Sequence, residues 1–325
     1  MNTTTNLTLT TADDMRLGAT LYEPEVPLAG GAQETSGTVL IHGATAVPQR
    51  YYGKFGRYMA SRGIRVMTYD YRGVGTSRPS SLRNFRAKMT DWVSDARAAH
   101  AFLREHRPGP VAIVAHSFGG QMVGLLDEYR EAKGAVFVGS QLGYYRHFPM
   151  PSRMRIEFAL RALIPATTAV LGYVPGKLGM GEDLPGGVAR QWAKWCLHPE
   201  YLLGHEPSAE DRFRAYDVPS LFYSFTDDEF APKRAVRAML SKIGRAPLAH
   251  RSVKPSDFDG KPIGHFGFFR PRFETSLWAD THEFLTRALS GDAFADMKAP
   301  KVEAENALVD YLFRREGRNT LCTAA

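Results

Sequence analysis

The residues around Ser117 have the order and the sizes that a nucleophilic serine requires. An apolar run at residues 111–115 predicts a short buried strand, and a helical pattern begins after Gly119. This is the strand–turn–helix order of a nucleophile elbow, G-x-S-x-G, in which large residues two positions from the serine would collide at the sharp turn. Ala115, in place of the usual first glycine, and Gly119 meet this requirement. The pattern favours a nucleophile over an ordinary serine in a strand-to-helix turn.

A nucleophilic serine needs a base that is itself oriented by a carboxylate, and two later segments could supply them. His265 lies in a predicted loop, with Gly264 before it and glycine again at position 267, so the loop can pass close to the serine. Asp228 follows a predicted buried strand, and we choose it as the acid, with Asp227 as the second choice. Because Pro232 would open the next helix, an acid here is also typical of a helix N-cap. The order serine, acid, histidine is the one expected after such an elbow.

Acyl transfer also requires hydrogen-bond donors aimed at the developing oxyanion. The backbone amide of Phe118, directly after the serine, is one candidate. The amide of Ala44, in the loop after the predicted strand 37–41, is the other. His42 in the same segment is more typical of a packing residue than of a catalyst.

Composition and charge exclude several classes of protein. The chain has 325 residues, 44% hydrophobic and 23% charged, which suits one elaborated domain or two smaller ones. The first residues lack the basic and apolar regions of a secretory signal, and the most apolar stretch, 156–173, is interrupted by Glu157, Arg161 and Pro165. We therefore expect a cytoplasmic protein without a membrane span.

The basic character of the chain does not by itself predict a nucleic-acid partner. The net charge is +7, but the basic residues are scattered among acids and form no recognisable binding motif. Gly73 and Gly75 begin a glycine pattern similar to a dinucleotide loop, yet Arg78 stands in the third glycine position. Two cysteines cannot build a disulfide framework, and no Cys/His cluster has zinc spacing. We expect no cofactor, no metal and no nucleic acid.

The elements that must position these side chains alternate along the chain. Alternating strands and helices imply an α/β fold with a mostly parallel sheet covered on both faces, whose strands end at one common edge. The predicted strands are 6–9, 16–22, 37–41, 64–69, 111–115, 134–138, 219–225 and 248–253, and the predicted helices are 51–62, 90–106, a helix from the elbow to about 133, 232–243 and 273–289.

The alternation is interrupted at residues 141–214, which we interpret as an inserted cap with helices at 152–163 and 187–197. The core would then comprise 1–140 and 215–290, and 291–325 would be a tail with a helix at 302–313. Aromatic and methionine side chains of the cap are candidates to line an apolar substrate pocket, or alternatively only bury the cap against the core. They are Tyr144, Tyr145, Phe148, Met150, Met154, Trp192 and Trp195.

Together these segments resemble the α/β-hydrolase-fold serine hydrolases, and most closely the cap-bearing bacterial branch described as serine aminopeptidase-like or predicted hydrolases. The resemblance spans residues 37–289 and rests on His42-Gly43, the 70–77 segment Asp-Tyr-Arg-Gly-Val-Gly-Thr-Ser, the elbow, Asp228 and Gly264-His265. It implies an eight-stranded mostly parallel sheet, a lid after the sixth strand and no cofactor. It also implies Ser117 as nucleophile, His265 as base and Asp228 as acid.

The expected function is a cofactor-free serine hydrolase of the carboxylesterase or thioesterase type, acting on a small or medium acyl ester or thioester. An acyltransferase or a carbon–carbon bond hydrolase using the same triad is one alternative, because this fold hosts many reactions. A ligand-binding protein with negligible turnover is another. The expected partner is a small-molecule acyl substrate, and a homodimer remains open.

Overall fold

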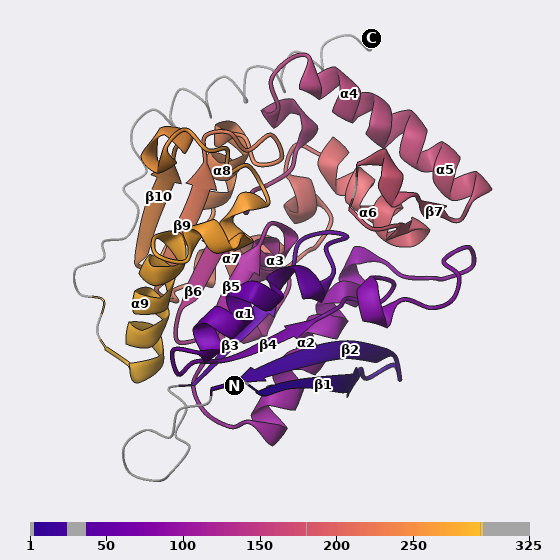
Figure 1. Ribbon diagram of the computed structural model, residues 1–325. Helices are drawn as coiled ribbons and strands as arrows, with labels where there is room; N and C mark the ends of the chain where they lie inside the picture. Colours follow the sequence, from indigo (N-terminus) through magenta and orange to yellow (C-terminus); the bar gives the residue numbers. More distant parts are fainter. Residues whose placement is uncertain (1–2, 25–36, 180, 293, 295–325) are drawn as a thin grey trace.

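The computed structural model describes residues 3–24, 37–179, 181–292 and 294, and these form one eight-stranded sheet flanked by helices (Figure 1). The strand order is β1-β2-β4-β3-β5-β6-β9-β10, in which β1–β2 and β2–β4 pair antiparallel and the other neighbours pair parallel. This confirms the predicted mostly parallel sheet. The strands are β1 (Thr3–Thr10), β2 (Arg16–Glu23), β3 (Thr38–His42), β4 (Arg65–Tyr69), β5 (Val111–His116), β6 (Ala135–Val138), β9 (Ser220–Phe225) and β10 (Leu248–Val253).

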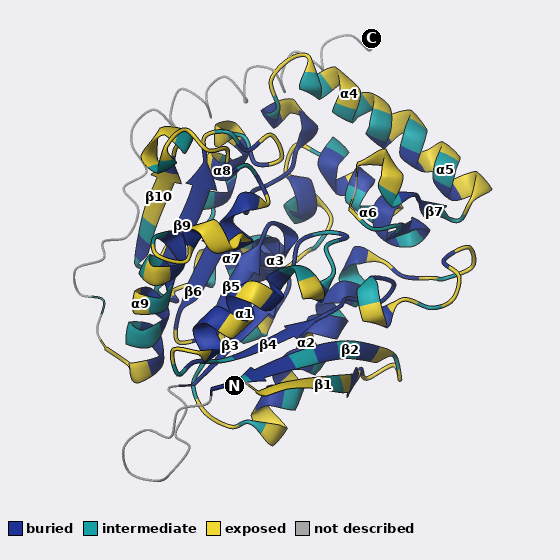
Figure 2. Ribbon diagram, viewed as in Figure 1, coloured by how far each residue is buried: buried dark blue, intermediate teal, exposed yellow. Residues whose placement is uncertain are grey.

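The central strands are buried on both faces, as parallel strands covered by helices must be (Figure 2). Helices α1 (Gly53–Ala60) and α9 (Leu277–Ser290) pack on one face, where Val114 of β5 lies in the same apolar cluster as Trp278. Helices α2 (Met89–His106) and α8 (Lys233–Leu240) pack on the other, with Ile113. Adjacent residues of one strand thus serve opposite layers of the core.

The helix after the elbow is shorter than predicted. Helix α3 covers only Phe118–Gln121, and separate 3₁₀ turns, Met122–Gly124 and Asp127–Glu131, replace the rest of the expected helix to about residue 133. Glycine is a weak helix former, and a Cβ at Gly124 would lie 2.4 Å from the ring of Phe213. The close approach of Phe213, 89 residues later, therefore has no counterpart in the local pattern that predicted the helix.

Between β6 and β9 the chain leaves the sheet, and we call residues 139–219 the insertion. It holds a helix longer than predicted, because Pro165 does not end it: the proline lies in the first turn of α5, directly after a π-helical turn, where a missing N–H costs least. The insertion contains α4 (Ser152–Phe158), the π-helical turn Ala159–Leu163, α5 (Ile164–Val170), α6 (Gly186–Leu197), α7 (Ala209–Ala215), and the small sheet of β7 (Tyr173–Val174) and β8 (Leu184–Pro185).

The insertion is tied to the loops at the carboxyl ends of β3 and β4. The backbone N–H of Glu182 donates to the Ala46 carbonyl at 2.9 Å, and the Glu182 carboxylate accepts from Arg50 at 2.6 Å and from the Gly75 amide at 2.9 Å. The carboxylate of Asp183, next to Glu182, forms an ion pair with Arg78 in the loop after β4, with 2.8 Å between nitrogen and oxygen. The insertion therefore closes onto the edge of the sheet where the strands end.

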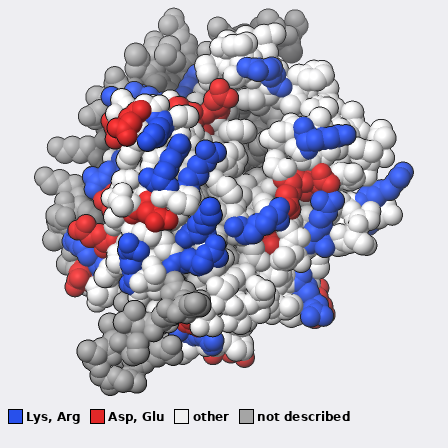
Figure 3. Space-filling model, viewed as in Figure 1, with Lys and Arg blue, Asp and Glu red and all other residues white. Residues whose placement is uncertain are grey.

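The charged side chains are dispersed over the surface. On the face in Figure 3, Lys and Arg residues are spread over both the sheet region and the insertion and are interleaved with Asp and Glu. None of the helices that the structure describes combines the length and the apolar content needed to cross a bilayer. The predicted helix at 302–313 lies outside the described residues.

Candidate active site

Ser117 sits on a strained turn between β5 and α3. Its backbone has φ 53° and ψ −111°, a conformation that L-residues adopt only where the surroundings enforce it. The Ser117 N–H donates to the Val138 carbonyl of β6 at 2.9 Å. A Cβ on Gly119 would lie 2.2 Å from the His42 carbonyl oxygen, so glycine is needed there because the turn packs against the end of β3. The serine is buried, with only 8% of it exposed.

His265 and Asp228 meet at the same edge. Nδ1 of His265 lies 2.7 Å from Oδ2 of Asp228, while Oδ1 of Asp228 accepts the amides of Phe230 at 2.8 Å and Ala231 at 2.9 Å. Because a carboxylate only accepts, Nδ1 of the neutral imidazole carries the proton and Nε2 keeps its lone pair. The pair is buried, and its geometry leaves Nε2 as the basic nitrogen.

Asp227, the residue before Asp228, contacts the backbone of the histidine loop rather than the imidazole. Oδ2 of Asp227 accepts the backbone N–H groups of Ile263 and Gly264 at 2.7 and 3.0 Å, directly before the histidine, and its Oδ1 is buried with no hydrogen-bond partner in the described part of the chain. The structure thus brings Asp228 to the imidazole and Asp227 to the backbone that carries it. The two adjacent aspartates share one loop in different roles.

Gly139, which the sequence analysis did not single out, lies against the His–Asp pair. Its φ is +58°, and a Cβ there would lie 3.2 Å from both Oδ2 of Asp228 and Nδ1 of His265. Val138, the residue before Gly139, accepts the hydrogen bond of the Ser117 amide. The end of β6 therefore contacts Ser117 as well as the His265–Asp228 pair. A glycine directly after a buried strand was the only signal in the sequence.

A buried polar chain runs beneath the serine. Nε2 of His116 lies 2.9 Å from the His265 carbonyl oxygen, and Nδ1 of His116 lies 3.0 Å from the Tyr52 hydroxyl. Because the carbonyl only accepts, Nε2–H of His116 donates to it, and Nδ1 accepts the Tyr52 O–H. Burial first, and then the nearby His265, hold the pKa of His116 well below its usual value, so His116 is neutral.

The two amides predicted to bind the oxyanion differ in their contacts. No hydrogen-bond partner of the Phe118 amide occurs among the described residues. The Ala44 amide, in contrast, donates to the Tyr52 hydroxyl at 2.8 Å. In this structure the Ala44 amide is therefore paired with Tyr52, eight residues later, whereas its role as an oxyanion donor stays a prediction.

A sequence model of the alpha/beta hydrolase family matches residues 38–276. The chain belongs to the alpha/beta hydrolase family. A search of curated protein sequences gave no match.

Solved structures similar to this α/β-hydrolase include several esterases. The esterase domain of a Rhodothermus marinus protein is 16% identical with a TM-score of 0.56, covering 88% of this chain and 99% of its own. Est1E of Butyrivibrio proteoclasticus, solved with ferulic acid bound, is 14% identical with a TM-score of 0.57, covering 87% and 99%. A putative hydrolase of Agrobacterium vitis S4 is 15% identical with a TM-score of 0.56, covering 87% and 98%. At these identities the likeness shows the shared fold.

The aromatic residues predicted to line a substrate pocket are mostly packing residues of this α/β-hydrolase. Trp195 is 1% exposed and packs edge-on against Tyr201, and Tyr144 and Tyr145 are buried in the same apolar cluster. Trp192 is partly buried against that cluster. These contacts match the alternative in which such side chains bury the insertion. The predicted methionines, Met150 and Met154, are each 61% exposed.

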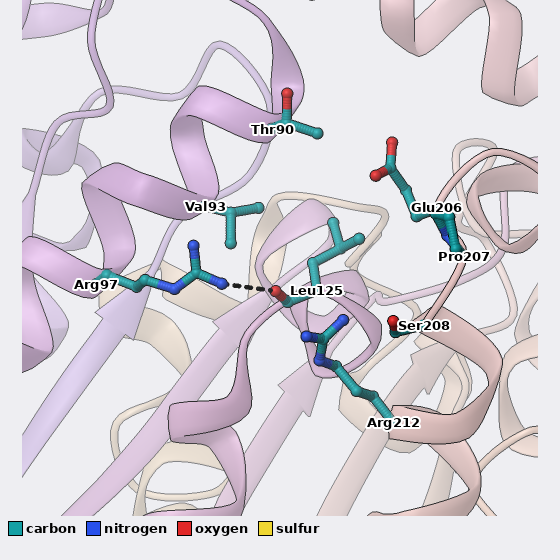
Figure 4. A pocket seen from close by; sticks show the side chains of 8 residues that line it. All are labelled: Thr90, Val93, Arg97, Leu125, Glu206, Pro207, Ser208 and Arg212. Atoms are coloured by element: carbon teal, nitrogen blue, oxygen red, sulfur yellow. Dashed lines mark hydrogen bonds between the residues drawn. The ribbon is translucent and has the colours of Figure 1, made fainter. Parts of the chain in front are cut away.

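One cavity of about 230 Å³ lies between α2, the segment after α3, and the start of α7 (Figure 4). Arg97 points into it and donates to the Leu125 carbonyl at 3.4 Å, and Arg212 on its opposite wall is paired with Asp127. None of its lining residues belongs to the Ser117 site. Within the described ranges, no group of three or more His, Cys, Asp or Glu side chains is arranged to hold a metal ion.

Proposed function

We propose that this protein is a serine hydrolase that cleaves a small or medium acyl ester or thioester through an acyl-enzyme on Ser117, without a cofactor. The observation that carries the proposal is the Asp228–His265 hydrogen bond of 2.7 Å at the edge of the sheet where β5 ends in the strained Ser117 turn. Family membership supports a hydrolase as the general class. The ester or thioester substrate is inferred from the chemistry of an activated serine.

In the proposed mechanism, Nε2 of His265 takes the proton of the Ser117 hydroxyl while the oxygen attacks the acyl carbon. Asp228 holds the imidazole and stabilises its positive charge. The tetrahedral intermediate then collapses: the bond between the acyl carbon and the leaving oxygen or sulfur breaks, and the imidazolium delivers its proton to the leaving atom. A water then gives a proton to Nε2 of His265 and attacks the acyl carbon. The bond between the acyl carbon and the Ser117 oxygen breaks, the imidazolium returns its proton to that oxygen, and the acid leaves.

The Phe118 amide is the main proposed donor to the oxyanion, because it lies at the N-terminus of α3 without a partner among the described residues. Ala44 is the second proposed donor. In this role the Ala44 N–H would either donate to the oxyanion in place of the Tyr52 hydroxyl or donate to both acceptors at once. In an apo site such hydrogen bonds are often incomplete and tighten only when substrate is bound.

We also propose that residues 141–214 act as a cap over this site, with 1–140 and 215–290 as the core and 291–325 as a tail. The ties from Glu182 to Ala46 and Gly75 support a cap that rests on the loops next to the serine. A cytoplasmic location stays part of the proposal, as does the homodimer alternative.

The test is labelling with a fluorophosphonate, which forms a covalent bond only with an activated serine. Stoichiometric modification of the wild type at Ser117, and none of Ser117→Ala, is the expected result. Ser117→Ala should also lower kcat on a p-nitrophenyl ester by on the order of 10⁴-fold or more while the protein stays folded. An unlabelled wild type would favour the ligand-binding alternative. Product analysis with added alcohols or amines separates hydrolysis from acyl transfer.

A further inference from the structure

Two aromatic rings beside the His265 imidazole are exposed although a packed protein usually buries them. Phe230 is 49% exposed and Phe266 is 36% exposed, whereas His265 itself is only 6% exposed. The centroids of the two phenyl rings lie 5.3 and 5.1 Å from that of the imidazole and 5.9 Å from each other. We call this pair the aromatic rim. Single exposed apolar side chains need no explanation, but a contiguous pair at a reactive group does.

The backbone under both rings is held by hydrogen bonds. The Phe230 N–H donates to Asp228, and the Phe230 carbonyl accepts from the Gln141 side chain at 3.2 Å. The Phe266 carbonyl accepts from the Tyr51 hydroxyl, and the two rings of that contact are perpendicular at 6.3 Å. Because the backbone beneath these rings is already fixed, little of the binding free energy of a ligand would be spent on ordering the loops.

The chemistry of the imidazole determines which half of a substrate meets these rings. The Nδ1 side of His265 is filled by Asp228, with Gly139 in close contact, so Nε2 is the nitrogen left for a substrate. Nε2 must deliver its proton to the leaving oxygen, which therefore lies within hydrogen-bond distance of it. The acyl oxygen lies instead toward the proposed donor at Phe118. Because both rings pack against the imidazole that delivers this proton, the leaving group is the half of the substrate that we assign to them.

We propose that Phe230 and Phe266 form the leaving-group subsite, and that the substrate is an ester whose alcohol half is apolar and preferably a flat aryl or arylalkyl group. Flat rings stack on aromatic side chains in offset or edge-on arrangements, beyond the effect of buried area alone. A large polar and anionic leaving group, such as that of an acyl-CoA thioester, gains nothing from this surface. The inference rests on the proposed serine hydrolase and selects an ester over a thioester.

The experiment uses acetate esters that differ only in the alcohol: ethyl, cyclohexylmethyl, benzyl and 2-naphthylmethyl acetate. All four alcohols are alkyl alcohols of similar acidity, so differences in kcat/KM report contacts with the alcohol half rather than leaving-group reactivity. The wild type should prefer 2-naphthylmethyl over ethyl acetate at least tenfold. Phe230→Ala and Phe266→Ala should each lose about tenfold on 2-naphthylmethyl acetate and less than threefold on ethyl acetate.

Phe102→Ala is the matched control, because Phe102 is partly exposed near the C-terminal end of α2, where its ring stacks on His106, and lies outside both the proposed cap and the site described here. It should leave all four rates unchanged. Equal losses on all four esters in the rim variants would overturn the subsite, since the rings would then only support the imidazole. A wild type that does not distinguish the alcohols would overturn it as well.

A second measurement does not depend on the acyl group. 2-Naphthylmethanol should slow fluorophosphonate labelling of wild-type Ser117, more than cyclohexylmethanol does, and this protection should disappear in both rim variants. Labelling without any protection refutes the subsite while leaving the serine hydrolase intact. Absence of labelling refutes the serine hydrolase itself, and the subsite falls with it.

Discussion

The side chain of His116 donates a hydrogen bond to the backbone carbonyl of His265, with 2.9 Å between Nε2 and the oxygen. The residue directly before the proposed nucleophile therefore holds the backbone of the proposed base. Their rings also pack, with centroids 5.1 Å apart. Through Tyr52 the same chain reaches Ala44, so one buried set of hydrogen bonds joins the loops of the nucleophile, the base and the second oxyanion donor.

Removal of the Tyr52 hydroxyl should destabilise the protein. Tyr52→Phe leaves the buried Ala44 amide and Nδ1 of His116 without a partner, which typically costs about 1–3 kcal/mol. Urea unfolding of the variant measures this loss. Tyr58→Phe is the control, because Tyr58 is 7% exposed and its hydroxyl has no partner among the described residues. Equal effects of the two substitutions would contradict the chain described here.

Substitution of Asp228 should lower kcat far more than substitution of Asp227. Asp228→Asn places an amide where the carboxylate accepts Nδ1–H, so kcat should fall by roughly 10³–10⁴-fold, as expected when the histidine loses its orienting acid. Asp227→Asn keeps an oxygen that can accept the Ile263 and Gly264 amides and should cost about tenfold or less. Steady-state kinetics on one p-nitrophenyl ester compares both variants. A larger loss in Asp227→Asn would reverse the proposed roles.

A methyl group at Gly139 should disturb the His–Asp pair. Gly139→Ala places a Cβ 3.2 Å from Asp228 Oδ2 and His265 Nδ1, so these groups must shift by a few tenths of an ångström. We expect kcat to fall about tenfold, because catalysis is sensitive to small displacements of the reacting groups. Gly63→Ala is a close control: Gly63 also has a positive φ, of +89°, but a Cβ added there would meet nothing within 4 Å. Each variant should lose about 1 kcal/mol of stability from backbone strain. Only Gly139→Ala should lose activity.

Acidification should destabilise the fold through a buried histidine pair. Nε2 of His42 and Nε2 of His100 lie 3.2 Å apart, and burial, followed by the nearby Arg104, lowers the pKa of His100 to about 4. Burial, followed by His100, lowers the pKa of His42 well below its usual value. The unfolded chain, in which histidine has a pKa near 6.5, then binds more protons than the folded chain between about pH 6.5 and 4.

Stability should therefore decrease as the pH falls through this window, and His100 alone should contribute a loss of about 2–3 kcal/mol at its lower end. Urea unfolding gives the free energy of unfolding of the wild type and of His100→Gln at several pH values. The contribution of His100 is the difference between the slopes of these free energies against pH. A variant with the same pH dependence as the wild type would show that His100 is not responsible.

Much of the fold was predictable because its signals are local. Short apolar runs alternate with helical patterns, and the mostly parallel sheet followed from them. The eight-stranded architecture and the membership of the hydrolase family followed from the resemblance of the motifs. Where a distant contact intervened, local patterns failed. Where the predicted helix after Ser117 is replaced by 3₁₀ turns, Gly124 packs closely against the distant Phe213. The helix that continues through Pro165 contains a π-helical turn that periodicity does not reveal.

The candidate site divides in the same way. The sequence by itself determined the turn that strains Ser117, because the sizes of its immediate neighbours decide whether such a turn is possible. Only the tertiary structure decided that Asp228 rather than Asp227 meets His265, and that Tyr52 occupies the Ala44 amide. The first contact bridges 37 residues and the second bridges eight, and each joins groups that local patterns do not place. The two adjacent acids differ only in the direction in which the folded backbone points them.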